Sequence, residues 1–417
     1  MQHVILGTGP AGVLAAEAIR KHKPADTIVL VGDENEPPYS RMAIPYLLAG
    51  DIAESGTYLR GGRDHFGPLR VELIDGRAER VDTVARTVHL TGGRSLPYDR
   101  LLLTTGSRPV RPRIPGIDHP KVLSCWTLED ARAIARALRP GARILQMGAG
   151  FIGCIIMEGL STRGRLTVVE MGDRVVPRMM TPAASAMIQR WCASKGVEFA
   201  TSTQVNAIEA DGDDKLLKVV LGKDPREFDV IVCATGVKPA VEYLKGSRVS
   251  IGPEGGIVVD LSMRTNLAEV YAAGDCTEAE DFSTGESFVN AIQPDAADQS
   301  LIAALNMAGQ PVAWRGALRM NVLATFGLVS SSFGQWWGTE GGEHVEVIDD
   351  MRFKYLRLEL QDDRVIGATS VGLKDHVGAL RGLIQTRTRL TPHWKATLMH
   401  DPHKFMDAYL ACAQDAA

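Results

Sequence analysis

Two glycine-rich turns are the residues of this sequence best suited to chemistry. The first, Gly7-Thr8-Gly9-Pro10-Ala11-Gly12, follows the apolar residues 3–6, and the second, Gly148-Ala149-Gly150-Phe151-Ile152-Gly153, follows residues 143–147. Where such a turn leads from a strand into a helix, bare backbone can approach a pyrophosphate, and the helix N-terminus supplies N–H donors and a partial positive charge. Two such turns predict two bound dinucleotides, and a chain that holds two dinucleotides usually moves electrons between them.

An acidic residue follows each turn at the end of the next predicted strand. Asp33 follows residues 27–31, about twenty residues past the last glycine, where an acid holds a ribose hydroxyl. Glu170 follows residues 166–169, and its carboxylate can accept both ribose hydroxyls of an adenosine. A 2′-phosphate at that place would face a like charge, which favours NADH over NADPH. The alternative for either acid is a solvated residue at a strand end.

Three later segments show a similar pattern, in which an apolar strand ends in a turn that contains glycine. An apolar strand over residues 101–103 runs into Thr104-Thr105-Gly106, and another over residues 229–233 runs into Thr235-Gly236. Residues 270–273 then lead to Gly274-Asp275, and a helical stretch spans residues 290–307. An acid at this last position can bind a ribityl hydroxyl, and the helix N-terminus can face a flavin carbonyl.

Composition narrows the class of protein. The 417 residues are 45% hydrophobic and 23% charged, with a formal charge of −4, as expected for a globular protein of two or three domains. This charge gives no basic field for nucleic acid, and no stretch is apolar enough to span a membrane. Met1-Gln2 leads straight into the first strand, so we expect no signal peptide and a cytoplasmic location. The six cysteines form no CxxC motif or close pair, which disfavours a zinc ribbon or a dithiol relay.

The order of these motifs resembles the class I pyridine nucleotide-dependent FAD oxidoreductases. Val31-Gly32-Asp33 with Pro38-Tyr39-Ser40-Arg41 is similar to the ferredoxin and rubredoxin reductases. The C-terminal part resembles the small domain of rubredoxin reductases and the flavin-binding portion of nitrite reductases. This resemblance covers nearly the whole chain and rests on five motifs in the same order.

The resemblance implies an α/β fold with two Rossmann-like, three-layer dinucleotide-binding domains of the glutathione-reductase type and a smaller C-terminal α+β domain. The expected FAD-binding domain is discontinuous, with residues 1–113 and 246–314. The NAD-binding domain would comprise residues 114–245, and the C-terminal domain residues 315–417.

The same resemblance assigns residues to two cofactors, FAD and NADH. For FAD, it implies contacts to every part of the cofactor, from the adenosine and the pyrophosphate to the ribityl chain and the isoalloxazine. The residues that it assigns to FAD are Gly7, Gly9, Pro10, Ala11, Gly12, Asp33, Arg41, Ala78, Thr105, Gly106, Asp275 and Phe288. For NADH, it implies a phosphate turn, a ribose carboxylate and a nicotinamide contact at Gly148, Gly150, Ile152, Gly153, Glu170 and Gly236. Phe151 matches an aromatic residue that covers the flavin in relatives, although a plain core phenylalanine explains it nearly as well.

The sequence departs from the family pattern in three places. Thiol-dependent members carry cysteines between about positions 38 and 50, whereas this chain has Met42-Ala43-Ile44-Pro45-Tyr46 there, which disfavours disulfide reductase, peroxidase and cysteine-based oxidase chemistry. Tyr46 and Ile155 stand where ferredoxin-reductase relatives have a Lys and a Glu, so both members of an ion pair are replaced together. A flavin-facing aromatic is also replaced around Asn321-Val322-Leu323. We therefore assign no catalytic residue and keep Phe151 and Tyr46 only as residues near the flavin.

The resemblance implies a hydride transfer from NADH to FAD, followed by electron transfer to a small ferredoxin- or rubredoxin-type protein. Two alternatives stay open. One is a reductase that acts directly on a quinone, a nitro compound or oxygen, and the other is a non-catalytic NADH-sensing flavoprotein. The sequence leaves the oligomeric state open, a homodimer included.

Other groups of residues give weaker indications. His393, His400, His403 and Asp401 have no standard metal-ligand spacing, so we expect no metal. Trp336-Trp337 suggests a domain core more than a docking patch. The cationic residues on the predicted NAD-side helices could steer an acidic carrier or simply be solvated: Arg132, Arg136 and Arg163.

Overall fold

The computed structural model describes residues 1–210 and 216–414. The chain folds into two compact units, which we describe separately. The first unit comprises Met1–Leu47, Asp51–Arg108 and Val237–Ala317, and the second comprises Leu48–Gly50, Pro109–Gly236 and Leu318–Ala417. The residue bounds of the three domains, as expected from the sequence, stay a prediction.

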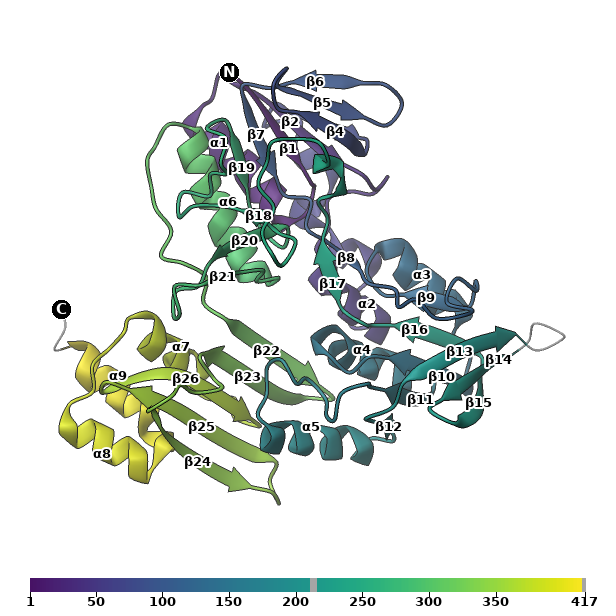
Figure 1. Cartoon of the computed structure of the whole chain (residues 1–417), viewed down its shortest axis with the longest axis vertical. Coiled ribbons are helices and arrows are strands. Elements are labelled where there is room, and N and C mark those ends of the chain that lie inside the picture. The colour runs from purple at the N-terminus through teal and green to yellow at the C-terminus, as the bar shows by residue number, and fades with distance from the viewer. Residues whose placement is uncertain (211–215, 415–417) are drawn as a thin grey trace. The chain divides into compact units, whose positions relative to one another are not determined.

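The first unit is built on a five-stranded parallel sheet (Figure 1). Its spatial order is β19 (Val270–Ala272), β7 (Arg100–Leu103), β1 (Gln2–Leu6), β2 (Thr27–Gly32) and β3 (Val71–Asp75). The central strands are unbroken apolar runs because both faces of a parallel sheet are covered. Helix α1 (Pro10–His22) connects β1 to β2 and packs against α6 (Gln293–Met307).

Three small sheets complete the first unit. They contain β4 (Ala78–Asp82), β5 (Thr87–Leu90) and β6 (Ser95–Pro97); β8 (Ser107–Pro109) and β17 (Val237–Pro239); and β18 (Ile257–Val258), β20 (Thr277–Glu280) and β21 (Ser287–Phe288). Residues of β4 and β5 share one hydrophobic core with α1, α6 and the central sheet. The short helices are η1 (Arg41–Ala43), α2 (Ile44–Ala49), η2 (Glu54–Thr57), η3 (Leu59–Gly61), η4 (Arg63–His65) and η5 (Glu242–Leu244).

The second unit contains another five-stranded parallel sheet. Its order is β12 (Glu198–Ala200), β11 (Gly164–Val169), β10 (Ala142–Met147), β16 (Val230–Cys233) and β9 (Val122–Ser124). Its helices are α3 (Leu128–Ala137), α4 (Phe151–Ser161) and α5 (Pro182–Ser194). A three-stranded antiparallel sheet, β13 (Val205–Ala210), β14 (Leu217–Leu221) and β15 (Asp224–Phe228), shares a core with β10 and β16.

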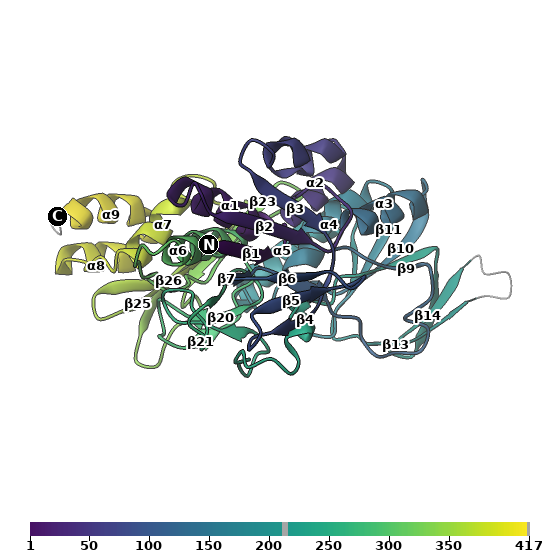
Figure 2. The ribbon, with the colours of Figure 1, turned by 90° about the horizontal axis from the view of Figure 1, so that it is seen from above.

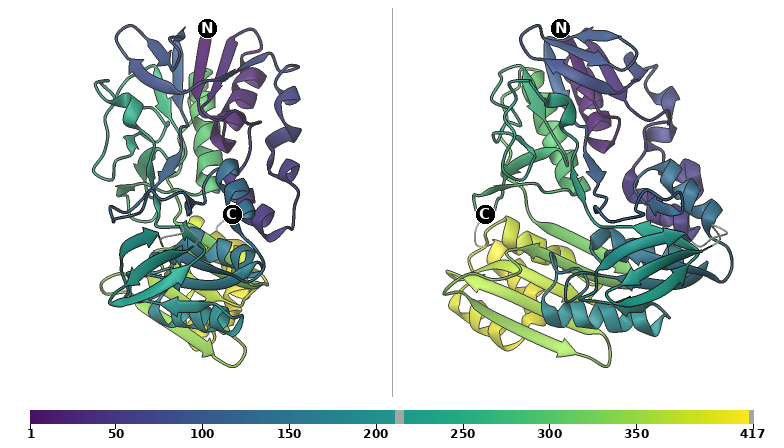
Figure 3. Two further views of the ribbon diagram at one scale, coloured as in Figure 1. Left: turned by 90° about the vertical axis from the view of Figure 1, so that its right-hand side faces the viewer. Right: turned by 45° about the vertical axis from the view of Figure 1, so that its right-hand side comes forward.

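The C-terminal part of the second unit is a five-stranded antiparallel sheet with helices beside it (Figures 2 and 3). The strands, in spatial order, are β22 (Met320–Thr325), β23 (Leu328–Gly334), β26 (Arg364–Val371), β25 (Lys354–Gln361) and β24 (Glu343–Asp349). The helices are α7 (Val377–Gln385), α8 (Pro392–His400), η6 (Pro402–Lys404) and α9 (Phe405–Gln414). The predicted fold class, two Rossmann-like domains and an α+β domain, is confirmed.

Candidate functional site

The first glycine turn lies between β1 and α1. Its first residue is fixed to the neighbouring strand, because the N–H of Gly7 donates a hydrogen bond to the carbonyl of Val31 over 2.8 Å. Gly9 is the N-cap of α1, Pro10 opens the helix, and no side chain among the described residues caps it. Since the first N–H groups of a helix have no partner within the helix, those of Ala11 and Gly12 are available to an anion.

Steric crowding explains why glycine is needed at two of these positions. Gly7 has a φ of +119°, and a Cβ there would lie 2.1 Å from the carbonyl oxygen of Thr104. A Cβ on Gly12 would lie 1.9 Å from the carbonyl oxygen of Gly7. A Cβ on Gly9, in contrast, would meet no described atom within 4 Å. The outer glycines therefore allow close packing, and the middle one leaves open backbone, which fits a pyrophosphate site.

The Thr-Gly turn after β7 supports the first glycine turn. The hydroxyl of Thr104 donates to the carbonyls of Leu6 and Gly7 at 2.9 and 3.2 Å. Thr105 instead turns its hydroxyl toward the carbonyl of Ala240, at 2.8 Å, and Gly106 has a φ of +65°. Thr104, which we did not single out from the sequence, is thus the residue that contacts the glycine turn.

Asp33 and Arg41 both follow β2 in the chain, and a set of hydrogen bonds holds the side chain of Arg41. Asp33 is an exposed residue that directly follows the strand. The guanidinium of Arg41 donates to Glu34 over 2.6 Å and to the hydroxyl of Tyr39 over 2.8 Å, and that hydroxyl donates to Glu34 over 2.6 Å. Burial lowers the pKa of Arg41, but Tyr39 and Glu34 outweigh this effect and raise it above the ordinary value. Sequence reasoning missed Glu34, although an acid beside a motif arginine was a usable signal.

Asp275 lies in a turn that approaches the first glycine turn. A Cβ on the preceding Gly274 would lie 3.6 Å from the Cβ of Ala11. The carboxylate of Asp275 accepts a hydrogen bond from the hydroxyl of Ser107 at 2.8 Å. Burial raises the pKa of Asp275, while Ser107 and the nearby charge of Arg41 lower it, with a net increase. The structure thus brings Ala11, Arg41 and Asp275 together, as a site for a polar, anionic ligand requires.

Three other predicted flavin-side residues lie on β21, β4 and α2. Phe288 is buried in β21, and Ala78 begins β4 as a half-buried residue. Tyr46 lies on α2 with 54% of its surface exposed. The roles of these three residues in the flavin site stay predictions.

The second glycine turn repeats the geometry of the first between β10 and α4. The N–H of Gly148 donates to the carbonyl of Val169 over 2.8 Å, just as Gly7 contacts Val31. A Cβ on Gly148 would lie 2.4 Å from the carbonyl of Ala234, and one on Gly153 would lie 2.4 Å from the carbonyl of Gly148. Gly150 again meets no described atom within 4 Å and forms an N-cap that no described side chain covers. The half-buried Phe151 and Ile152 form the first turn of α4.

Glu170 lies directly against this second turn. Its Oε2 accepts a hydrogen bond from the N–H of Ala149 at 2.7 Å, and its Oε1 accepts one from the N–H of Gly172 at 2.8 Å. Two backbone donors therefore hold the carboxylate at the mouth of the turn. Gly236 follows β16 with a φ of +99° and open space around its Cβ position among the described residues.

The cysteines are buried, and burial makes most of their thiols poor acids. Burial raises the pKa of Cys125 and of Cys192 to about 12, and that of Cys233 and of Cys276 to about 11. Burial also raises the pKa of Cys154 well above its ordinary value. These five thiols stay protonated at neutral pH, and a protonated thiol is a poor nucleophile.

The weaker candidates lead to no additional site. Over residues 1–210 and 216–414, no three His, Cys, Asp or Glu side chains gather as metal ligands, the C-terminal histidines included. Trp336 and Trp337 meet edge to face with 5.6 Å between ring centres. Arg132 and Arg136 both pair with Glu129 on the same helix. None of the helices in the described parts of the chain has both the length and the apolar character needed to cross a bilayer.

Comparison with known proteins places this geometry in context. The family described as pyridine nucleotide-disulphide oxidoreductase matches residues 1–294. The epsilon subunit of the NADH-dependent phenylglyoxylate dehydrogenase of Aromatoleum evansii is 33% identical over 94% of this chain and 93% of its own length. The ferredoxin–NAD(+) reductase component of the anthranilate 1,2-dioxygenase system of Burkholderia cepacia is 30% identical over 97% and 96%. A solved NAD-dependent persulfide reductase from A. fulgidus has a TM-score of 0.85 and 29% identity over 93% of this chain and 77% of its own.

Proposed function

This chain belongs to the pyridine nucleotide-disulphide oxidoreductase family, and from that membership we propose that it delivers electrons from NADH, through FAD, to a small iron–sulfur or rubredoxin-type protein. It is an NADH-dependent FAD oxidoreductase. The identity of the electron acceptor is the part that we add as a proposal. The same proposal includes the three-domain division predicted from the sequence.

We assign FAD to the first unit. Gly7, Gly9 and Gly12 would form the pyrophosphate turn there, and the cluster of Arg41 and Asp275 would bind the polar middle of the cofactor. NADH would bind in the second unit, on the turn from Gly148 to Gly153. The chemistry that bound FAD supplies is the exchange of a two-electron hydride for single electrons, which a protein scaffold cannot provide alone.

Glu170 provides the selectivity for NADH in this proposal. Its carboxylate is held by the N–H groups of Ala149 and Gly172, so it cannot easily turn away from the mouth of the turn. A fixed carboxylate can accept hydrogen bonds from ribose hydroxyls. A 2′-phosphate at the same place would meet a like charge, which is costly at a contact shielded from water.

The observation that carries the assignment of the acceptor is that all six cysteines are buried and that none lies in the segment around Tyr46. The segment from Met42 to Tyr46 contains no cysteine, and burial raises the pKa values of five cysteines far above neutrality. We infer that electrons leave by a route that does not use these five thiols. The Burkholderia cepacia relative, which is matched over nearly its whole length, is named as a ferredoxin reductase component, and this supports a carrier protein as the acceptor.

Anaerobic reduction followed by a carrier screen tests this function. NADH should bleach the flavin absorbance band within seconds, and NADPH should act much more slowly. Purified ferredoxins and rubredoxins, each with cytochrome c as the final acceptor, should then raise the rate of NADH consumption in proportion to their concentration. A rate that no carrier changes would remove the proposed acceptor and leave the NADH-dependent oxidoreductase activity in place.

Direct reduction of a small molecule is the second candidate. The solved structure that this chain resembles over most of its length is named as a persulfide reductase. Steady turnover of NADH with a quinone, a nitro compound, a persulfide or oxygen, at a rate independent of any carrier, would favour this candidate. The absence of a cysteine near Tyr46 is the feature that ranks it second.

A further inference from the structure

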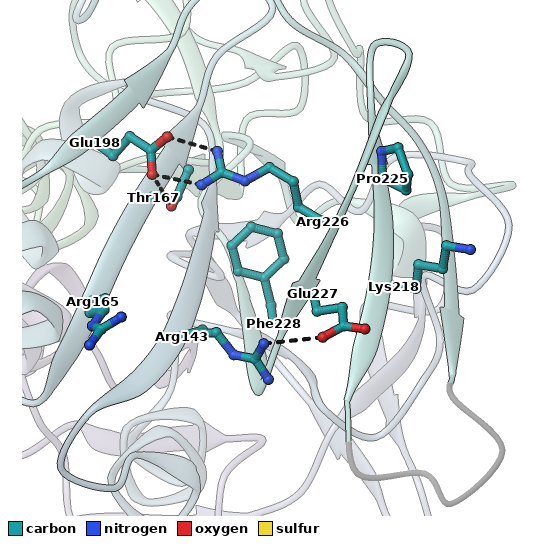
Figure 4. A pocket seen from close by; sticks show the side chains of 9 residues that line it. All are labelled: Arg143, Arg165, Thr167, Glu198, Lys218, Pro225, Arg226, Glu227 and Phe228. Carbon is teal, nitrogen blue, oxygen red and sulfur yellow. Dashed lines mark hydrogen bonds and ion pairs between the residues drawn. The ribbon is translucent and has the colours of Figure 1, made fainter.

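A cleft with a volume of about 640 Å³ lies in the second unit, away from its glycine turn (Figure 4). We call it the arginine cleft, because three arginines line it: Arg143 from β10, Arg165 from β11 and Arg226 from β15. Its other lining residues are Thr167, Glu198, Lys218, Pro225, Glu227 and Phe228. The volume falls within the range of small-molecule sites, about 300–1,000 Å³.

The cleft is separate from the nucleotide turn because it lies at the opposite ends of the same strands. Arg143 and Arg165 stand at the beginnings of β10 and β11, whereas Gly148 and Glu170 follow the ends of these strands. At about 3.3 Å per residue, the five residues from Arg143 to Gly148 span roughly 16 Å. A ligand in the cleft would therefore leave the glycine turn free.

Strand register places two of the arginines side by side. Arg143 and Arg165 are direct partners in the parallel pairing of β10 with β11, so both side chains project from the same face of the sheet. Neighbouring strands lie about 4.8 Å apart, and like charges on neighbouring strands repel each other. Nearby negative charge reduces this repulsion.

The protein supplies that negative charge to Arg143 but not to Arg165. The side chain of Arg143 donates to Asp229 over 3.3 Å and to Glu227 over 3.2 Å. Arg165 is exposed, and within residues 1–210 and 216–414 its side chain makes no hydrogen bond or ion pair. All five N–H donors of this guanidinium are thus available, in the planar arrangement that suits a carboxylate or a phosphate.

The antiparallel sheet contributes two more cations to the cleft, Arg226 from β15 and Lys218 from β14, and an ion pair joins Arg226 to Glu198 of the parallel sheet. Arg226 donates two hydrogen bonds to Glu198, at 2.8 and 2.7 Å, and Thr167 donates to the same carboxylate at 3.0 Å. Figure 4 shows Lys218 on the far side of the cleft from Arg165. Lys218 is exposed and lies in register between Glu209 and Glu227, but in the described residues no ion pair within 4 Å engages it.

We propose that the arginine cleft binds a small organic molecule with two anionic groups, one on Arg165 beside Arg143 and the second toward Lys218. The anionic groups are carboxylates or phosphates, because a guanidinium recognises both in the same planar way. A small molecule suits this concave cleft better than a protein surface does, since protein–protein contacts are usually broader and flatter. Lys218 has acidic neighbours, so its contribution is the smaller one.

Isothermal titration calorimetry on the FAD-loaded enzyme tests this proposal. Succinate, as a dicarboxylate, and fructose 1,6-bisphosphate, as a bisphosphate, are the two probes, and acetate is the monoanionic control, all at constant ionic strength. We expect saturable binding of one equivalent of at least one probe in the millimolar range or tighter. The stronger of the two probes identifies the carboxylate or the phosphate source. Saturating NADH should leave this binding unchanged, because the two sites lie at opposite strand ends.

Variants on the two walls make the assignment specific. Arg165→Gln should weaken probe binding at least tenfold and Lys218→Gln about threefold, since each removes an exposed cation from the cleft. Lys223→Gln is the matched control, because Lys223 is an exposed cation near the turn between β14 and β15 that does not line the cleft. Retained FAD absorbance shows that each variant is folded. The proposal is overturned if neither probe shows saturable binding or if NADH displaces the probe. It is also overturned if Arg165→Gln and Lys223→Gln bind the probe with equal affinity, or if Arg165→Gln weakens only the binding of a carrier protein.

Discussion

The carboxylate of Glu170 accepts a hydrogen bond from the backbone N–H of Ala149 over 2.7 Å. This bond joins the acid at the end of β11 to the glycine turn at the end of β10, and the N–H of Gly172 holds the second carboxylate oxygen at 2.8 Å. A residue that binds both its own loop and the neighbouring turn is placed before any nucleotide arrives. Such preorganisation reduces the entropy that binding has to overcome.

We therefore expect Glu170→Ala to raise the KM for NADH at least tenfold, a loss of about 1.4 kcal/mol or more in binding. The ratio of NADH to NADPH turnover should fall, because the like charge that opposes a 2′-phosphate is gone. Bound FAD should stay intact. Glu209→Ala removes an exposed glutamate from β13 and should change neither value. Unchanged discrimination between the two nucleotides in Glu170→Ala would contradict the role of this carboxylate.

The middle glycines of the two turns distinguish the two cofactor sites. Gly9 and Gly150 have φ values of −72° and −73°, which alanine adopts without strain, and a Cβ at either position meets no described atom within 4 Å. Gly9→Ala should therefore fold but bind FAD at least tenfold more weakly, because the methyl group blocks the approach of the phosphates. Gly150→Ala should keep FAD and raise the KM for NADH.

Flavin absorbance after gel filtration and steady-state kinetics measure these two effects. Each variant is the control of the other, since both carry the same change in equivalent turns. If Gly9→Ala left FAD binding unchanged and raised the KM for NADH, the assignment of the two cofactors to the two units would be reversed.

Asp275 predicts a trade-off between stability and cofactor binding. Burial raises its pKa in the folded protein, so its ionisation destabilises the folded state, and this cost appears as the pH rises above the ordinary range near 4. Asp275→Asn removes the charge but keeps an acceptor for Ser107. The FAD-free variant should melt at a higher temperature than the FAD-free parent at pH 7, and the difference should disappear as the pH falls below about 4.

The same Asp275→Asn variant should retain less FAD, because it loses a charged acceptor in the cofactor site. Thermal melts of the FAD-free and FAD-loaded proteins over a pH series measure both effects. Asp64→Asn, which neutralises an exposed aspartate in the same unit, should leave both unchanged. A variant that melts below the parent at every pH would show that Asp275 is structural and does not have the role assigned to it.

Tyr355 joins the C-terminal sheet to the NAD-side helix α5. Its hydroxyl lies 2.7 Å from the hydroxyl of Thr181, the N-cap of α5, and it also donates to Glu346. Tyr355→Phe should lower the free energy of unfolding by about 1–2 kcal/mol, since the buried hydroxyl of Thr181 loses a hydrogen bond. Denaturant unfolding measures this loss, and the affinities for FAD and NADH should not change. The hydroxyl of Tyr409 has no hydrogen bond among the described residues, so Tyr409→Phe should leave the free energy of unfolding unchanged.

The sequence by itself determined the two nucleotide turns, because their chemistry is local. A positive φ at Gly7 or Gly148, an open helix N-terminus and an acid at the next strand end all follow from residues within one β-α-β unit. It also predicted the fold class, since unbroken apolar strands alternating with helices form a covered parallel sheet. The sequence alone also shows that the segment around Tyr46 contains no cysteine, and this absence supports an electron acceptor that needs no thiol.

Only the tertiary structure decided which distant groups meet. Ser107 bonds to Asp275 across 168 positions, and Tyr355 to Thr181 across 174, because separate strands and helices pack together. The pairing of Arg143 with Arg165 depends on strand register, since a shift by one residue would place the two side chains on opposite faces. Local patterns specify turns and elements, whereas register and packing, which are properties of the whole fold, determine the charges that surround each site.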